Sequence, residues 1–205
     1  PDTKSMESID KIDEEGIRVF RRNMQMIFQD PYESLNPRWT IKDIIKEPLD
    51  IHNIGSFSER EDAVVEILRT VGLTPPENYM SRYPHEISGG QRQRVSIART
   101  LVMKPKFVVC DEPTSMLDVS IRISIMDLML NLAKELDVSY LYITHDLAVA
   151  RYMCNRIAVM FNGKIVEIAE TEELLNNPIH PYTKRLISSI PIPDPSYKRE
   201  QYEMN

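Results

Sequence analysis

The stretch Ile87-Ser-Gly-Gly-Gln-Arg-Gln-Arg94 decides how the rest of this sequence is interpreted. Ser88 is suited to cap a helix, and Gln91, three residues later, completes the capping-box pattern of a helix start. Two glycines in the first turn weaken such a helix by about 1 kcal/mol each relative to alanine. Their use is to let backbone N–H groups and the positive end of the helix dipole approach an anion. A capped helix with a purely structural role is the alternative, but the pattern favours a phosphate-binding helix start.

Strands and helices alternate along the chain after this helix, which we expect to end near residue 103. Asn162-Gly163 lies between two alternating apolar runs, which is a strong hairpin signal. Strands alternating with helices predict a mostly parallel α/β sheet. The predicted elements are strands at 107–110 and 140–144, helices at 119–136 and 147–153, a hairpin of 156–161 with 164–168, and helices at 172–176 and 182–189.

The chain before residue 87 contains one strand and several helices. Residues 13–22 have a helical pattern, residues 24–28 alternate like a short strand, and two prolines make residues 30–37 a loop. Apolar residues then recur at helical spacing from 40 to 72, so two or more helices separate the first strand from the next. We expect four parts: a core remnant at 1–33, an inserted helical subdomain at 34–103, a core at 104–170, and a C-terminal extension at 171–205.

Two adjacent carboxylates follow the apolar strand at 107–110. Asp111 and Glu112 stand at its C-terminal end, which is where α/β sheets place their ligand crevice. Carboxylate and phosphate oxygens are the ligands that Mg²⁺ prefers. A solvated surface turn is the alternative, but the buried strand before the pair and Pro113 after it favour a metal and water-activation site.

These motifs resemble those of the ATP-binding-cassette (ABC) ATPases. Ser-Gly-Gly-Gln at 88–91 is similar to that family's signature motif, and four more motifs occur here in the family's order. Met116 stands where the D-loop more often has alanine, which is a mild departure. The resemblance implies a P-loop NTPase-like (RecA-like) fold with an inserted helical subdomain. The matching motifs are Gln29 as the Q-loop, 107–113 as Walker B, 115–118 as the D-loop and His145 as the switch histidine.

The resemblance also implies roles for these residues. Glu112 and His145 would be catalytic, with Glu112 acting on the attacking water and His145 on the γ-phosphate or the water. Asp111 and Gln29 would hold Mg²⁺. The nucleotide would be bound by Gln29 and by the signature residues Ser88, Gly89, Gly90 and Gln91. Asp118 would join this nucleotide-binding set from a dimer interface. The expected cofactors are therefore ATP and Mg²⁺.

The C-terminal part narrows the resemblance to one subfamily. Residues 177–184 and 188–193, together with 27–31 and 34–37, resemble ATP-binding subunits of oligopeptide and dipeptide importers. Such a subunit pairs with a second ABC ATPase subunit and with transmembrane permease subunits, and acts indirectly with a solute-binding protein. The implied location is cytoplasmic, peripheral on the inner face of the cell membrane. We therefore expect a chain that energises a peptide-type importer.

A phosphate-binding loop is missing from this sequence. No Gly-x-x-x-x-Gly-Lys-Ser/Thr pattern occurs among the 205 residues, which contain only 6 glycines. In the family this loop precedes the Q-loop, so we expect a truncated cassette that lacks an N-terminal strand and this loop. The remaining core should then expose apolar surface, and this chain alone should bind MgATP weakly and not turn it over.

Two other function classes remain as alternatives. The first is a non-hydrolytic cassette-like chain with a binding or regulatory role, which keeps the fold but not turnover. The second is a soluble non-transport ABC ATPase, acting for example in DNA repair or translation. A formal net charge of −6 and a pI of about 5.3 disfavour nucleic-acid partners. The His180-Pro-Tyr-Thr183 extension would not be expected in that class either.

Overall fold

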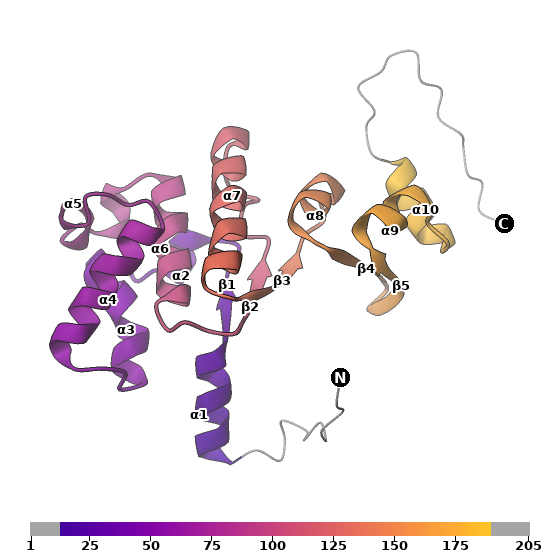
Figure 1. Cartoon of the computed structure of the whole chain (residues 1–205). Helices are drawn as coiled ribbons and strands as arrows, with labels where there is room; N and C mark the ends of the chain where they lie inside the picture. Colours follow the sequence, from indigo (N-terminus) through magenta and orange to yellow (C-terminus); the bar gives the residue numbers. More distant parts are fainter. Residues whose placement is uncertain (1–12, 190–205) are drawn as a thin grey trace. The chain divides into compact units, whose positions relative to one another are not determined.

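The structure is a computed structural model, and it describes residues 13–189 (Figure 1). The sequence also predicts a loose tail for the last ten residues, and these lie outside this range. Among the described residues, no helix is long and apolar enough to cross a membrane. The chain divides after Ile143 into two compact units, which are described separately.

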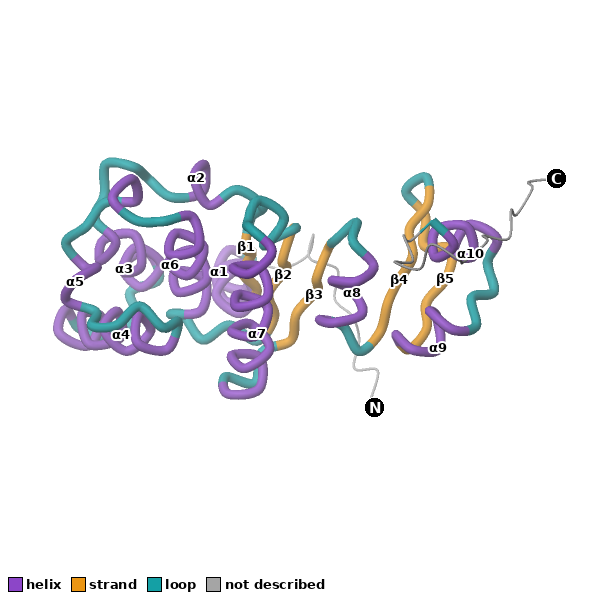
Figure 2. The backbone as a smooth tube through the Cα atoms, turned by 90° about the horizontal axis from the view of Figure 1, so that it is seen from above, coloured by secondary structure: helices purple, strands orange, loops and turns teal. Residues whose placement is uncertain are grey.

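The first unit contains eleven described elements. They are α1 (Glu14–Asn23), β1 (Met24–Ile27), α2 (Pro31–Ser34), α3 (Ile41–Ile51), α4 (Phe57–Thr70), α5 (Glu77–Met80), the 3-10 turn η2 (Pro84–Glu86), α6 (Gly89–Leu101), β2 (Phe107–Asp111), α7 (Val119–Glu135) and β3 (Ser139–Ile143). The order β1-β2-β3 is parallel throughout, so the predicted parallel sheet is confirmed. Only helical elements separate β1 from β2, as predicted, and Figure 2 shows them gathered beyond the β1 edge of the sheet. The prediction of a loop at 30–37 was wrong in part, because Asp30 caps the short helix α2 and proline is favoured in a first helical turn.

The two faces of this sheet differ in exposure. Ile27, Val108 and Cys110 point to one face and are fully buried. The opposite face carries Met24 and Met26 on β1 together with Leu141 and Ile143 on β3, each at least 37% exposed. The register puts Met26 level with Leu141 across Val109, so these side chains form one apolar surface. Exposed apolar surface on this core was expected from the sequence.

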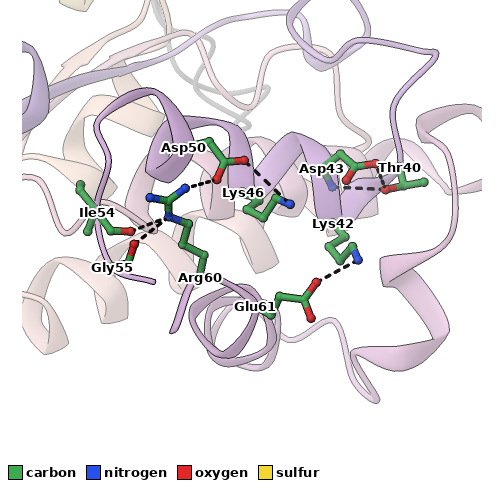
Figure 3. A network of polar contacts seen from close by, with 9 residues as sticks. All are labelled: Thr40, Lys42, Asp43, Lys46, Asp50, Ile54, Gly55, Arg60 and Glu61. Atoms are coloured by element: carbon green, nitrogen blue, oxygen red, sulfur yellow. Dashed lines mark hydrogen bonds and ion pairs between the residues drawn. The ribbon is translucent and has the colours of Figure 1, made fainter. Parts of the chain in front are cut away.

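The helices α3, α4 and α6 pack through aliphatic side chains, and polar contacts tie α3 to α4. Lys42 forms an ion pair with Glu61 at 3.0 Å (Figure 3). Arg60 bonds Asp50 at 2.6 Å and also donates to the carbonyl oxygens of Ile54 and Gly55, the turn between the helices. Arg60 on α4 therefore holds the turn between α3 and α4 in place. The fully buried aliphatic residues here include Ile41, Ile45, Leu68, Ile97 and Leu101.

The second unit contains α8 (Leu147–Met153), β4 (Arg156–Phe161), β5 (Lys164–Glu170), α9 (Thr171–Asn176) and α10 (Pro181–Ser188). β4 and β5 form the predicted antiparallel hairpin. Asn162 and Gly163 at its tip have φ values of 49° and 77°, the left-handed pair that a tight hairpin turn requires. A small core of Ala150, Ile157, Val159 and Leu174 holds the unit together. The four-part division expected from the sequence remains a prediction.

Candidate functional site

The candidate site begins where two neighbouring strands end. The parallel register pairs Ile27 with Cys110, so the residues after β1 and the end of β2 meet at one edge of the sheet. Gln29 follows β1 by two residues, Asp111 ends β2, and Glu112 comes directly after it. The sheet thereby brings Gln29 to the adjacent pair Asp111 and Glu112, although Glu112 follows Gln29 by 83 positions in the sequence.

Gln29, Glu112 and Ser115 form a hydrogen-bonded group at this edge. The amide nitrogen Nε2 of Gln29 lies 3.2 Å from Oε2 of Glu112 and 3.4 Å from Oγ of Ser115. The Ser115 hydroxyl also donates to the backbone carbonyl of Glu112 at 3.0 Å. The Gln29 amide therefore orients the Glu112 carboxylate directly. Ser115 was predicted only as part of a loop, because a serine in a turn carries no signal of this contact.

Glu112 has a strained backbone. Its φ is 42°, a left-handed conformation that is rare for residues other than Gly, Asn and Asp. Its N–H donates to the carbonyl of Ile143 at 3.0 Å, so the strand pairing continues one residue past β2 before the chain turns. Strain of this kind costs on the order of 1 kcal/mol or more and concentrates at functional positions. No local sequence pattern indicates this strain.

Asp111 is half-buried at the end of β2. Within residues 13–189, no group of three or more His, Cys, Asp or Glu side chains could hold a metal ion. Mg²⁺ is commonly bound by one or two carboxylates plus phosphate oxygens and waters rather than by a protein cage. Asp111 fits that donor set, with most of the other ligands supplied from outside the chain.

The start of α6 has the predicted capping box. The Ser88 N–H donates to Oε1 of Gln91 at 3.0 Å, and the Gln91 N–H donates to Oγ of Ser88 at 3.3 Å. The two glycines differ in their surroundings. A Cβ at Gly90 would lie 2.7 Å from Cγ2 of Ile121 on α7, whereas one at Gly89 would meet only Leu117, at 4.0 Å. Close packing against α7 is thus a structural reason for Gly90, in addition to the expected approach of an anion.

Three arginines of α6 tie it to neighbouring helices and loops. Arg94 donates to the carbonyl of Val71 at 2.6 Å and to the hydroxyl of Ser124 at 2.9 Å, and burial lowers its pKa. Arg99 bonds Glu47 at 2.8 Å. Arg92 donates twice to the carbonyl of Ile87, at 2.8 and 3.1 Å. α6 is therefore the element on which this part of the unit is assembled, which its sequence alone did not indicate.

Asp118 belongs to the first unit and His145 to the second. Asp118 is exposed at the N-cap position of α7 and its side chain makes no capping bond. His145 follows β3 by two residues and belongs to the second unit, in a turn where the Asp146 N–H donates to Oγ1 of Thr144. Asp146 caps α8 through the N–H of Ala148 at 2.8 Å. Of the predicted site residues in the first unit, Gln29 is hydrogen-bonded to Glu112, and Ser88 is hydrogen-bonded to Gln91.

Comparisons with protein families match most of the chain. Residues 3–115 match the family described as ABC transporter, and residues 166–205 match the oligopeptide/dipeptide transporter, C-terminal region. Among curated proteins, the chain is 55% identical over 183 residues to the oligopeptide transport ATP-binding protein OppF of Bacillus subtilis, covering 89% of this chain and 59% of that protein. It is 53% identical over 189 residues to AmiF of Streptococcus pneumoniae, covering 92% and 60%.

Solved structures share the fold. A dimeric post-hydrolysis state of the ATP-binding cassette MJ0796, bound to ADP and Pi, matches with a TM-score of 0.66 and 30% identity, over 79% of this chain and 69% of that one. The cbiO1 protein of Clostridium perfringens, part of the ABC transporter complex cbiONQ, matches with a TM-score of 0.70 and 26% identity, over 86% and 65%. The chain spans about three fifths of the length of the curated relatives.

Proposed function

The chain belongs to the ABC transporter family, and on this premise we propose that it is the ATP-binding and ATP-hydrolysing part of a peptide importer. The observation that carries the proposal is the Gln29–Glu112 hydrogen bond at the carboxyl ends of two parallel strands. A glutamate that is held by an amide beside a second carboxylate is suited to orient and deprotonate an attacking water.

The proposed roles follow from the chemistry of each side chain. Glu112 accepts the proton of the attacking water, and Gln29 holds the Glu112 carboxylate through the 3.2 Å bond. His145 donates a hydrogen bond to the γ-phosphate or to the water. Asp111 and Gln29 would hold Mg²⁺, which when bound would neutralise charge on the phosphates. The proton of the water is transferred to the Glu112 carboxylate, so no further base is needed in this step.

The start of α6 serves a nucleotide held by a partner cassette. The N–H groups at this helix start and the positive end of the helix dipole suit a phosphate, and the Ser88 side chain is exposed there. Gly89, Gly90 and Gln91 complete the segment, and Asp118 contacts the partner. We propose that ATP is bound between this segment and the phosphate-binding loop of a second ATPase subunit.

The remaining partners follow from the C-terminal match. A region of the oligopeptide/dipeptide type at 166–205 supports an assembly with transmembrane permease subunits and, through them, a solute-binding protein. The subunit would then act in the cytoplasm, on the inner face of the membrane. Co-purification of tagged chain with hydrophobic permease subunits tests this assembly. Recovery of the chain with nucleic acid instead would contradict it.

The sequence contains no phosphate-binding loop pattern. We therefore propose that this 205-residue chain alone binds MgATP weakly and does not hydrolyse it. Phosphate release by the purified chain, free of contaminating ATPases, would contradict this proposal. A non-hydrolytic cassette-like chain is the alternative, and the intact Glu112 and His145 argue against it.

A complementation assay tests the use of α6. The full-length Bacillus subtilis OppF, with its own signature serine replaced, supplies a phosphate-binding loop but lacks a working signature. Adding this chain should restore ATP hydrolysis, and the Ser88→Ala variant should restore it at least about tenfold less, because a hydrogen bond to a charged group is worth about 1.5 kcal/mol or more. The Glu112→Gln variant is the matched control and should restore hydrolysis fully, because the catalytic glutamate in this mixed site belongs to the partner. No restoration by the unmodified chain would reject the proposal.

A hybrid chain tests Glu112 itself. Joining the N-terminal segment of the same relative to residue 13 of this chain supplies a phosphate-binding loop in cis. Glu112→Gln in this hybrid should lower the hydrolysis rate by about 10²- to 10⁴-fold, the usual worth of a general base, while ATP binding persists. An equal rate in the variant would remove Glu112 from the proposed role.

A further inference from the structure

The ring of Tyr32 covers the guanidinium of Arg92. The Cζ atom of Arg92 lies 3.7 Å from the centre of the ring, which is the shortest of the three cation–π distances among the described residues. Tyr32 belongs to α2, three residues after Gln29, and Arg92 belongs to the first turns of α6. The contact therefore joins the segment of the candidate catalytic edge to the start of the signature helix.

Arg92 is held in an unusual environment for a cation. It is only 8% exposed, its Nη1 atom is buried without a hydrogen-bond partner, and no acidic side chain within residues 13–189 forms an ion pair with it. Its other donors, Nε and Nη2, both reach the carbonyl of Ile87. The positive charge is therefore stabilised by the Tyr32 ring and one carbonyl oxygen. A cation–π contact is stronger where the cation is desolvated.

The Ile87 carbonyl directly precedes Ser88, the N-cap of α6. A guanidinium that bonds this carbonyl fixes where the chain enters the helix, and with it the direction of the first N–H groups. The backbone of Tyr32 is held by Asp30, whose Oδ1 accepts the Tyr32 N–H at 2.7 Å, and the preceding Pro31 is buried. The far end of α2 is joined to α6 as well, because Arg99 donates to the carbonyl of Ser34 at 3.5 Å.

We propose that Tyr32 and Arg92 are positioning residues that transmit the placement of the Gln29 segment to the phosphate-facing start of α6. The proposal rests on the proposed function, in which Gln29 acts at one nucleotide and the α6 start at another. The contacts run from Glu112 to Gln29, along two residues of chain to Tyr32, then through Arg92 to the Ile87 carbonyl. A displacement of the Gln29 segment thus changes the support of the helix start within one subunit.

Hydrogen exchange on the full 205-residue chain tests the link without nucleotide. In Tyr32→Leu, the N–H groups of Gln91 and Arg92 should exchange about tenfold faster, because a desolvated cation–π contact no longer holds the helix start. In Tyr32→Phe the ring remains and exchange should equal that of the unmodified chain. The N–H groups of Ala98 and Leu101, deep in α6, serve as internal references and should not change.

Tyr79→Leu is the matched control. It removes a second cation–π contact, with Arg82 at 5.6 Å, from a helix that does not carry the proposed link. Tyr32 is 63% exposed, so its replacement should leave the chain folded, which circular dichroism checks. Unchanged exchange at Gln91 and Arg92 in Tyr32→Leu would overturn the proposal. Equal acceleration in Tyr32→Phe would overturn it too, because the ring face would then be irrelevant.

The complementation assay separates positioning from a merely structural contact. Tyr32→Leu should lower the maximal rate of restored hydrolysis about tenfold with little change in the ATP concentration for half-maximal rate, since the partner's loop still binds ATP. Tyr32→Phe should restore the full rate. Faster exchange together with an unaltered maximal rate would overturn the positioning role. If the unmodified chain restores no hydrolysis, the proposed function fails, while the exchange measurement still decides the Tyr32–Arg92 link.

Discussion

Replacing Gly90 by alanine is the most direct test of how α6 packs. The new Cβ would lie 2.7 Å from Cγ2 of Ile121, closer than real side chains approach. Cγ2 branches at the Cβ of Ile121, and β-branched side chains are stiff at χ1, so it is not free to move aside. Overpacking of this kind costs about 1–3 kcal/mol. Alanine in a helix recovers up to about 1 kcal/mol relative to glycine. The net destabilisation of Gly90→Ala should therefore be about 1 kcal/mol.

The single tryptophan, Trp39, reports on this unit in a urea titration. With an m-value of about 2 kcal/mol/M, Gly90→Ala should lower the unfolding midpoint by about 0.5 M. Gly89→Ala is the matched control: its Cβ meets Leu117 at 4.0 Å, an ordinary contact, so its midpoint should not fall. In an Ile121→Ala background the Gly90→Ala change should be neutral or stabilising. A midpoint for Gly90→Ala equal to that of Gly89→Ala, or an equal loss in both backgrounds, would refute the packing argument.

Three further changes test the described contacts. Gly163→Ala should destabilise the hairpin by about 1 kcal/mol, because φ is 77° there although the space is open, whereas Asn162→Gly should not; thermal unfolding by circular dichroism compares them. Arg94→Lys should lower the free energy of unfolding by about 1–2 kcal/mol in the Trp39 titration, because one ammonium does not replace the guanidinium that joins Val71 to Ser124. A loss as small as that of an arginine-to-lysine replacement at an exposed position would count against this role. Hydrogen bonds from Arg151 lower the pKa of Glu172 below its ordinary 4.5. This exposed pair therefore stabilises the second unit above that pH, and the stabilisation is lost as the pH falls through the lowered pKa. Glu172→Gln should make thermal unfolding less sensitive to acid, and an acid profile identical to that of the unmodified chain would contradict this.

Much of the fold was predictable because its signals are local. The capping box at Ser88 and Gln91, the Asn162-Gly163 turn and the strand periodicities each depend on a few consecutive residues, and all were found where expected. Element ends moved by one or two residues, as when α6 ended at Leu101 rather than near 103. Helix ends fray and carry weak sequence signals, so such shifts are ordinary.

The contacts at the site were less predictable because they join distant residues. The family resemblance implied that Gln29 and Glu112 act at one nucleotide site, but no sequence pattern predicted that the amide and the carboxylate meet at 3.2 Å. Ile121 follows Gly90 by 31 positions, and only the packing of α7 on α6 brings them together. No sequence pattern indicates a contact between Tyr32 and Arg92, because their stacking depends on where α2 lies against α6. Tertiary packing, which no local pattern encodes, decides each of these.

The left-handed backbone at Glu112 has an evolutionary consequence. Glycine or asparagine would adopt a φ of 42° more readily, so either change should make the isolated chain more stable by up to about 1 kcal/mol. A library screened only for heat resistance should therefore enrich such replacements at this position and discard the carboxylate. A screen for ATP hydrolysis by the hybrid chain, which carries a phosphate-binding loop in cis, should keep the glutamate and accept the lower stability. Position 112 would then separate selection for stability from selection for hydrolysis.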